Sequence, residues 1–219
     1  MAPVVVAPEM DPLATGALGL GAAWASGINV YAVVLTLGLL DMAGWIDLPP
    51  QLAPLASPFV LSVAGFMYLA EFVADKIPGV DHLWDAVHTF IRIPAGAILA
   101  AASIGAVDPE LAIAAAIAGG TLAAGTHFTK ASTRAAVNLS PEPFSTWVAS
   151  LFEDAAAVGG TVLAIVYPIA FLVALAVFVA LAIWLLPKLI RFAARVLIRI
   201  VRWFRGELHP SPPDPASPP

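Results

Sequence analysis

Residues 81–92 read DHLWDAVHTFIR, and the apolar run IPAGAILAAASIGAV follows them directly at residues 93–107. The ionisable residues of the first stretch are spaced four, three and four apart, so a helix carries them on one face. The apolar run is only about 22 Å long as a helix, too short to cross a hydrocarbon core of about 30 Å. Part of the charged face must therefore lie at membrane depth or line a polar cavity, where ionisable groups are costly and mark function. These residues are Asp81, Asp85, His88 and Arg92.

The composition is that of an integral membrane protein. Of the 219 residues, 60% are hydrophobic and 11% are charged, and the mean hydropathy is +0.91. A soluble domain carries roughly 25% charged residues and could not bury this much apolar surface. The chain has no cysteine, which excludes disulfides and thiolate metal sites.

Six apolar segments predict an all-α bundle of six membrane-spanning helices. The loops after the first, third and fifth segments carry no Lys or Arg, whereas the opposite side holds Lys76, Lys130, Arg134 and a basic C-terminal stretch. The positive-inside rule then places both termini in the cytoplasm. We expect a multi-pass membrane protein with spans at residues 17–40, 58–75, 84–107, 110–129, 144–159 and 161–187, and a turn at Gly159–Gly160.

The two ends of the chain differ in composition. Residues 1–16 form an N-terminal tail without the basic region of a cleavable signal, and residues 209–219 are Pro-rich and predicted to be disordered. Residues 188–208 predict a basic amphipathic helix lying on anionic membrane lipid, which we favour over a helix that binds a partner or nucleic acid. Its basic stripe consists of Lys188, Arg191, Arg195, Arg199 and Arg202.

Weak internal similarity divides the membrane region into two halves, residues 17–107 and 108–187. ASGINVYA at residues 25–32 resembles AAGTHFTK at residues 123–130, and a Pro-Phe pair opens both the second and the fifth span. Halves of three spans each would have opposite orientations, which is the inverted repeat of many transporters. The alternative is convergent composition among Ala- and Gly-rich helices.

Further polar residues lie within the other predicted spans, and together they define a candidate cavity that binds substrate or protons. Some carboxylates are spaced so that they share one helix face, and others lie near the middle of a predicted span. Basic residues spaced three and four apart form a stripe that continues the fourth span. The set consists of Asn29, Tyr31, Glu71, Asp75, Asp81, Asp85, His88, Arg92, His127, Lys130, Arg134, Glu153 and Asp154.

Three interpretations of this set remain open. In the first, the charges pair with one another and only hold helices together. In the second, deep carboxylates bind and release protons that are coupled to a solute. In the third, a divalent metal ion is the bound group. Its ligands would come from Glu71, Asp81, Asp85, His88 and Glu153, with Asp75 and Asp154 as further carboxylates.

The sequence contains none of the HExxH, GxSxG, P-loop or strand-associated GxGxxG motifs, so it favours a non-enzymatic role.

We predict a small transporter or permease for a small solute or ion, with divalent-cation transport or a non-transporting, lipid-binding scaffold as alternatives. Glu71, Asp85, His88, His127 and Glu153 would face a common cavity. An anionic group would bind Arg92, Lys130 and Arg134. Ala115, Gly119 and Ala123 offer a small-residue face for a homodimer.

Three stretches resemble the small bacterial membrane proteins of the domain of unknown function 4126 family. They are residues 26–39 (SGINVYAVVLTLGL), residues 67–97 (MYLAEFVADKIPGVDHLWDAVHTFIRIPAGA) and residues 124–154 (AGTHFTKASTRAAVNLSPEPFSTWVASLFED). The resemblance covers roughly residues 18–185. It implies a multi-pass bacterial protein of the inner membrane, without implying an activity. Its motifs include Trp84 and most of the candidate site residues.

Overall fold

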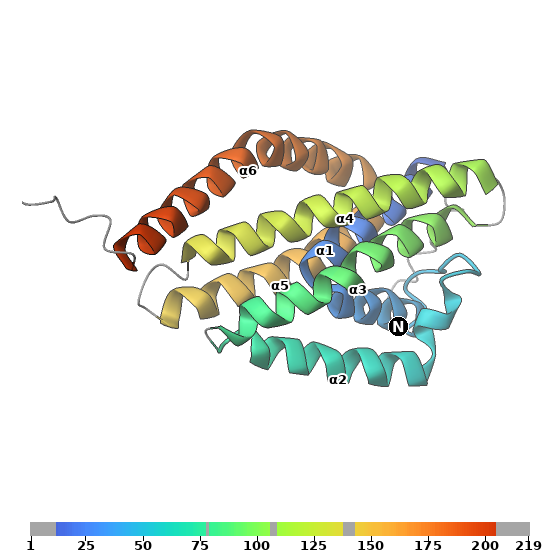
Figure 1. Ribbon diagram of the computed structural model, residues 1–219. Helices are drawn as coiled ribbons and strands as arrows, with labels where there is room; N and C mark the ends of the chain where they lie inside the picture. The colour runs from blue at the N-terminus through green and yellow to red at the C-terminus, as the bar shows by residue number, and fades with distance from the viewer. Residues whose placement is uncertain (1–11, 78, 106–108, 138–142, 205–219) are drawn as a thin grey trace, which may run out of the picture.

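The computed structural model describes residues 12–77, 79–105, 109–137 and 143–204, which form a bundle of α-helices (Figure 1). The elements are α1 (Pro12–Met42), the short 3-10 helix η1 (Ala53–Ala56), α2 (Pro58–Ala74), α3 (Val80–Ile104), α4 (Pro109–Val137), α5 (Pro143–Val166) and α6 (Pro168–Phe204). Among the described residues, α1, α3, α4, α5 and the first part of α6 are long and apolar enough to cross a membrane, and α2 is a shorter apolar helix. The predicted all-α membrane bundle is confirmed.

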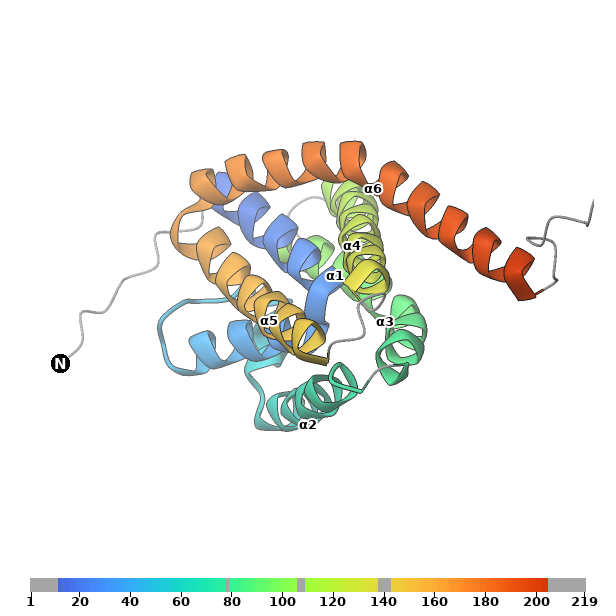
Figure 2. The same ribbon diagram turned by 90° about the vertical axis from the view of Figure 1, so that its left-hand side faces the viewer.

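Helix α1 is the central helix of the bundle and packs against every other helix (Figure 2). Glycines let the backbones of α1, α3 and α4 approach closely, as small residues do in membrane helices. A Cβ at Gly27 of α1 would collide with the Ala123 carbonyl oxygen of α4. A Cβ at Gly96 of α3 would collide with the Ala123 side chain. This close packing brings the polar stripes of α3 and α4 against α1.

The backbone of α1 is interrupted at Asn29, near the middle of the helix, where φ is −152° and ψ is 101°. The amide of Ala32 donates a 3.0 Å hydrogen bond to Asn29 Oδ1. Asn29 therefore caps the second half of α1 as an N-cap residue does. Because the regular hydrogen bonds stop here, backbone carbonyls of the preceding turn become available to partners on other helices.

Helix α2 lies at the edge of the bundle with most of its surface exposed. Its exposed side chains are large and apolar, including Phe59, Phe66 and Leu69. Its buried residues are Ala64, Glu71 and Ala74. A helix with this pattern contacts lipid along most of its length and turns a single carboxylate inward.

The predicted turn at Gly159–Gly160 is wrong, because α5 continues through both glycines to Val166. The turn lies at Tyr167, and Pro168 begins α6, where its missing amide costs no helical hydrogen bond. A Cβ at Gly160 would collide with the Trp24 ring of α1. This glycine serves the packing of α5 against α1, and the fifth and sixth spans shift accordingly.

The basic segment expected as a separate helix over residues 188–208 is the continuation of α6, which runs through Pro187 to Phe204. Figure 2 shows α6 changing direction part of the way along, as expected for a helix with an internal proline. At the other end, α1 begins at Pro12, inside the predicted tail of residues 1–16. Residues 1–11, 205–208 and the Pro-rich segment 209–219 lie outside the described residues.

The inverted repeat and the homodimer stay predictions. Helix α4 is continuous through His127, whereas α1 is interrupted at Asn29, the corresponding position of the proposed repeat. A Cβ at Gly119 of α4 would collide with Ala100 of α3, and Ala123 is fully buried. The small-residue face proposed for a dimer is therefore used largely inside the chain.

Candidate functional site

Charged side chains from α2, α3, α4 and α5 meet inside the bundle, and we call this group the charge cluster. It contains four carboxylates and three cations joined by ion pairs. All are buried except Glu153, whose side chain is 14% exposed. Its members are Glu71, Asp75, Asp85, Arg92, Lys130, Arg134 and Glu153.

Arg92 of α3 joins three helices with one guanidinium group. Its Nη2 lies 2.7 Å from Glu71 Oε1 of α2, and its Nη1 lies 2.8 Å from Asp85 Oδ1 of its own helix. The same Nη1 lies 3.0 Å from His127 Nδ1 of α4. A planar guanidinium with several fixed donors suits such a junction, whereas an ammonium group would not reproduce it.

Arg134 of α4 forms a second junction, nearer to the end of the helices. Its Nε donates to Glu153 Oε1 of α5 at 2.8 Å, and its Nη2 donates to Asp75 Oδ2 at the end of α2 at 2.8 Å. Its Nη1 also donates to the Asp75 backbone carbonyl at 3.1 Å. Arg134 therefore fastens the end of α2 to α4 and α5.

Lys130 lies between the two arginines and contacts both sets of carboxylates. Its Nζ is 3.5–3.7 Å from carboxylate oxygens of Glu71, Asp75, Asp85 and Glu153. It also donates a 3.0 Å hydrogen bond to the backbone carbonyl of Ile28. That carbonyl belongs to the turn of α1 that precedes the interruption at Asn29. Lys130 therefore connects the charge cluster to the broken backbone of α1.

Asp154 of α5 contacts the interruption of α1 from another helix. Asn29 Nδ2 donates a 3.0 Å hydrogen bond to Asp154 Oδ1. Within the described part of the chain, the buried Asp154 Oδ2 has no hydrogen-bond partner. Tyr68 of α2 lies near enough to interact with this carboxylate. One oxygen of Asp154 thus holds α1, and Tyr68 of α2 lies beside the same carboxylate.

The contacts of His127 define its protonation state. Arginine can only donate, so the Arg92 contact makes His127 Nδ1 an acceptor. The proton is then on Nε2, which lies 2.7 Å from Thr89 Oγ1. The Thr89 hydroxyl in turn donates to the Asp85 carbonyl at 3.0 Å. His127 is therefore neutral and connects Arg92 to the backbone of α3.

His88 and Tyr31 form a separate polar pair beside the charge cluster. His88 Nδ1 lies 2.8 Å from the Trp84 carbonyl, which can only accept, so this nitrogen carries a proton. His88 Nε2 lies 3.0 Å from the Tyr31 hydroxyl of α1. The imidazole also stacks on Trp84, with ring centroids 4.4 Å apart. This pair links α3 to the second half of α1.

The structure gives Asp81 a different position from the other candidate residues. Its Oδ1 accepts hydrogen bonds from the amides of Gly79 and His82, both at 2.8 Å, so it lies at the turn between α2 and α3. The other candidates meet in the charge cluster, at the interruption of α1 or in the His88–Tyr31 pair. Whether they face a common cavity, and whether the three cations bind an anionic group, stay predictions.

Sequence reasoning missed two groups at the site. Thr89 lies four residues after Asp85 and three before Arg92, so the helical spacing could have identified it. The Ile28 carbonyl is available only because α1 is interrupted, and no proline marks this position. Side-chain spacing therefore carries no signal for it.

The carboxylates of the site are paired with cations. Within residues 12–77, 79–105, 109–137 and 143–204, no group of three or more His, Asp or Glu side chains is positioned to hold one. The carboxylates of the charge cluster converge on Arg92, Lys130 and Arg134 instead. The interpretation in which a divalent cation is the bound group has no assembled ligand set in the described part of the chain.

A family model described as "Domain of unknown function (DUF4126)" matches residues 17–188. The match covers most of the chain and includes every member of the charge cluster. No curated protein and no solved structure matches the chain.

Proposed function

This chain belongs to the DUF4126 family, and we propose that it is a small integral membrane permease that couples the movement of a small solute to protons. The observation that carries the proposal is the interruption of α1 at Asn29, with ionisable side chains beside it. Discontinuous membrane helices of this kind form the substrate and ion sites of many transporters, because the interrupted backbone offers polar groups at membrane depth.

The contacts at the interruption provide a way to couple charge to helix position. Lys130 of α4 holds the carbonyl at the end of the first half of α1, and Asp154 of α5 holds the side chain that caps the second half. A change of charge on either group alters the force on one half of α1 relative to the other. The two halves therefore provide the two-state element that alternating access requires.

The charge balance supports proton binding. Together with Asp154, the charge cluster contributes five carboxylates, against its three cations and Lys76, whose charge also interacts with Asp154 and Asp75. Unpaired charge is costly in a low-dielectric interior, and binding a proton removes that cost. Glu153 is partly exposed and offers a route for protons from outside the bundle.

A second candidate is a non-transporting scaffold, which the close ion pairing favours. Arg92 and Arg134 each bind two carboxylates at 2.8 Å or less and tie together α2, α3, α4 and α5. Such a network also fits a purely structural role, in which loss of one partner lowers stability by about 3–5 kcal/mol. The two functions differ in whether any solute changes the proton flux.

Reconstitution into liposomes that contain a pH-sensitive dye distinguishes the two functions. Pools of amino acids, sugars, organic acids and inorganic ions are added outside, and the internal pH is followed. We expect one pool to change the internal pH with the wild type, and Asp154→Asn and Glu71→Gln to abolish that change. Asp47→Asn is the matched control, because Asp47 is an exposed carboxylate that does not belong to the charge cluster.

Folding of each variant is checked by size-exclusion chromatography and thermal unfolding before reconstitution. Wild-type flux in folded Asp154→Asn and Glu71→Gln would rule out proton coupling through these groups. If none of the pools changes the internal pH with the wild type, the non-transporting scaffold becomes the favoured function.

A further inference from the structure

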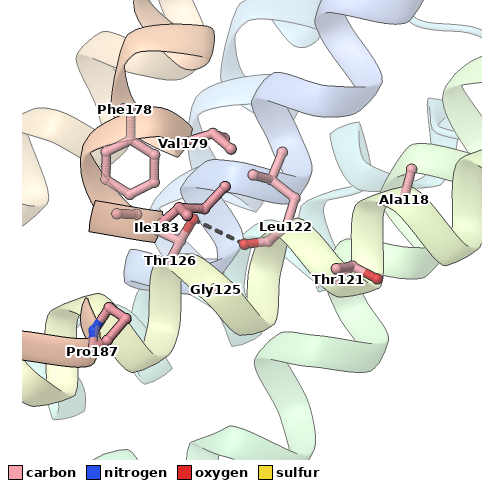
Figure 3. Close-up of a pocket in the computed structure, with 10 residues that line it drawn as sticks. Ala118, Thr121, Leu122, Gly125, Thr126, Phe178, Val179, Ile183 and Pro187 are labelled. Atoms are coloured by element: carbon pink, nitrogen blue, oxygen red, sulfur yellow. Dashed lines mark hydrogen bonds between the residues drawn. The ribbon is translucent and has the colours of Figure 1, made fainter. Parts of the chain in front are cut away.

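An apolar groove lies between α4 and the first part of α6 (Figure 3). It has a volume of about 590 Å³ and is lined by Ala118, Leu122 and Gly125 of α4 and by Phe178, Ile183 and Pro187 of α6. This volume is in the usual range of small-molecule sites. Apart from Pro187, the lining residues lie within the parts of α4 and α6 that are long and apolar enough to cross a membrane, so lipid is the natural surrounding of the groove.

The threonine hydroxyl groups that line the groove donate hydrogen bonds within α4. The Thr121 hydroxyl donates to the Ile117 carbonyl at 2.7 Å. The Thr126 hydroxyl donates to the Leu122 carbonyl at 3.0 Å (Figure 3). Neither hydroxyl proton is offered to a ligand. Gly125 leaves the wall open, since a Cβ there would meet nothing within 4 Å. The lining therefore fits a hydrocarbon chain.

One end of the groove leads to a basic surface. Pro187 lines the groove, and Lys188, Arg191 and Arg195 follow it on α6 with exposed side chains. Their spacing of three and four places them on one helix face. Arg191 Nε donates to the Pro187 carbonyl at 3.0 Å, which holds this guanidinium beside the end of the groove.

We propose that this groove binds an acyl chain of an anionic phospholipid whose phosphate contacts Lys188, Arg191 and Arg195. Charge complementarity selects this occupant, because the apolar length of the groove is followed at one end by cations. Anionic lipids of the cytoplasmic leaflet attract basic segments beside a membrane span, and guanidinium groups bind phosphate with two parallel donors. If a second copy of this chain occupied the groove instead of a lipid, it would have to place acidic side chains beside these three cations.

Binding is tested on the full-length protein in neutral detergent by native mass spectrometry. Dioleoyl phosphatidylglycerol and dioleoyl phosphatidylcholine are added in separate titrations. We expect one phosphatidylglycerol to be retained preferentially, and Gly125→Leu to lose it by filling the groove. Gly159→Leu of α5 is the matched control and should retain the lipid, because a Cβ at Gly159 also meets nothing within 4 Å.

The headgroup contacts are tested separately. Arg191→Gln should weaken phosphatidylglycerol binding about fivefold, as expected for one basic residue at an anionic surface, whereas Arg202→Gln should change it less. Soluble glycerol phosphate should not displace the lipid, because it lacks the acyl chain. These variants alter exposed side chains, so they remain informative even if Gly125→Leu lowers stability.

Equal retention of the two lipids would overturn the proposal, as would a folded Gly125→Leu that still retains phosphatidylglycerol. Dimers of the wild type that Gly125→Leu converts to monomers would also overturn it, and would assign the groove to a second copy. Displacement of phosphatidylglycerol by glycerol phosphate would overturn the proposal as well, because it would show that the basic surface binds phosphate without the groove.

Discussion

The ammonium group of Lys130 on α4 donates a 3.0 Å hydrogen bond to the carbonyl of Ile28 on α1. In an uninterrupted α1 this carbonyl would accept from the amide of Ala32, which instead donates to Asn29 Oδ1. The same ammonium lies 3.5–3.7 Å from four carboxylates of the charge cluster. One side chain thus joins the backbone of the central helix to the charges of three other helices.

Replacing this ammonium group should destabilise the protein strongly. Lys130→Met leaves the carboxylates with one cation fewer and removes the donor to Ile28, so we expect a loss of about 3–5 kcal/mol. The measurement is thermal unfolding in detergent, followed by tryptophan fluorescence. Adding Glu71→Gln to Lys130→Met should recover part of the loss, because one buried negative charge is removed with its partner.

Lys188→Met is the control for this prediction. Lys188 is exposed, and its Nζ lies over the Trp184 ring without contacting the charge cluster. Its replacement should change stability by about 0.5–1 kcal/mol, the size of an exposed cation–π contact. Equal transition temperatures for the two lysine variants would show that the Lys130 contacts contribute no net stability.

The polar stripes could be predicted from the sequence because they depend only on helical periodicity. Asp85, His88 and Arg92 recur at three- and four-residue spacing, and all three are buried on the inner face of α3. His127, Lys130 and Arg134 follow the same rule on α4. Composition alone also predicts the membrane bundle. The candidate residues and the fold class can therefore be predicted from the local sequence pattern.

Pairing between helices could not be predicted in this way. Which carboxylate binds Arg92 or Arg134 depends on how the helices pack, and several pairings satisfy the spacing equally. The interruption at Asn29 has no proline, and it is held by Lys130 and Asp154, which are distant in sequence. The sequence wrongly predicts a turn at Gly160 for the same reason, because the packing partner of this glycine, Trp24, lies on another helix.

Asn29 and Asp154 should be exchangeable as a pair but not singly. Asn29→Asp keeps an oxygen for the Ala32 amide but loses the Nδ2 donor and places two carboxylates beside each other. We expect it to lower stability by about 1–3 kcal/mol, the cost of an unsatisfied buried group. The double variant Asn29→Asp/Asp154→Asn restores one amide and one carboxylate, so it should recover most of that loss.

The comparison uses the free energy of unfolding at one pH in the same detergent. Asp154→Asn alone supplies the second single variant, so that the coupling free energy between the two positions is obtained. A coupling near zero would mean that the Asn29–Asp154 hydrogen bond does not hold α1.

The close approach of α1 and α4 at Gly27 gives a prediction with a matched control on the other helix. Gly27→Ala would drive a Cβ into the Ala123 carbonyl oxygen and against Thr126, both on α4. Overpacking of this kind costs about 1–3 kcal/mol. It should also lengthen the Lys130–Ile28 contact, because the same two helices carry it.

Gly125→Ala makes the same substitution in α4, at a glycine where a Cβ meets nothing within 4 Å. Alanine is the better helix former, so this variant should gain up to about 1 kcal/mol. Thermal unfolding of the two variants in parallel measures the difference, and hydrogen exchange of the Ala32 amide reports opening at the interruption. If Gly27→Ala matched Gly125→Ala in both measurements, the backbones of α1 and α4 would not be in the contact that places Lys130 against the broken helix.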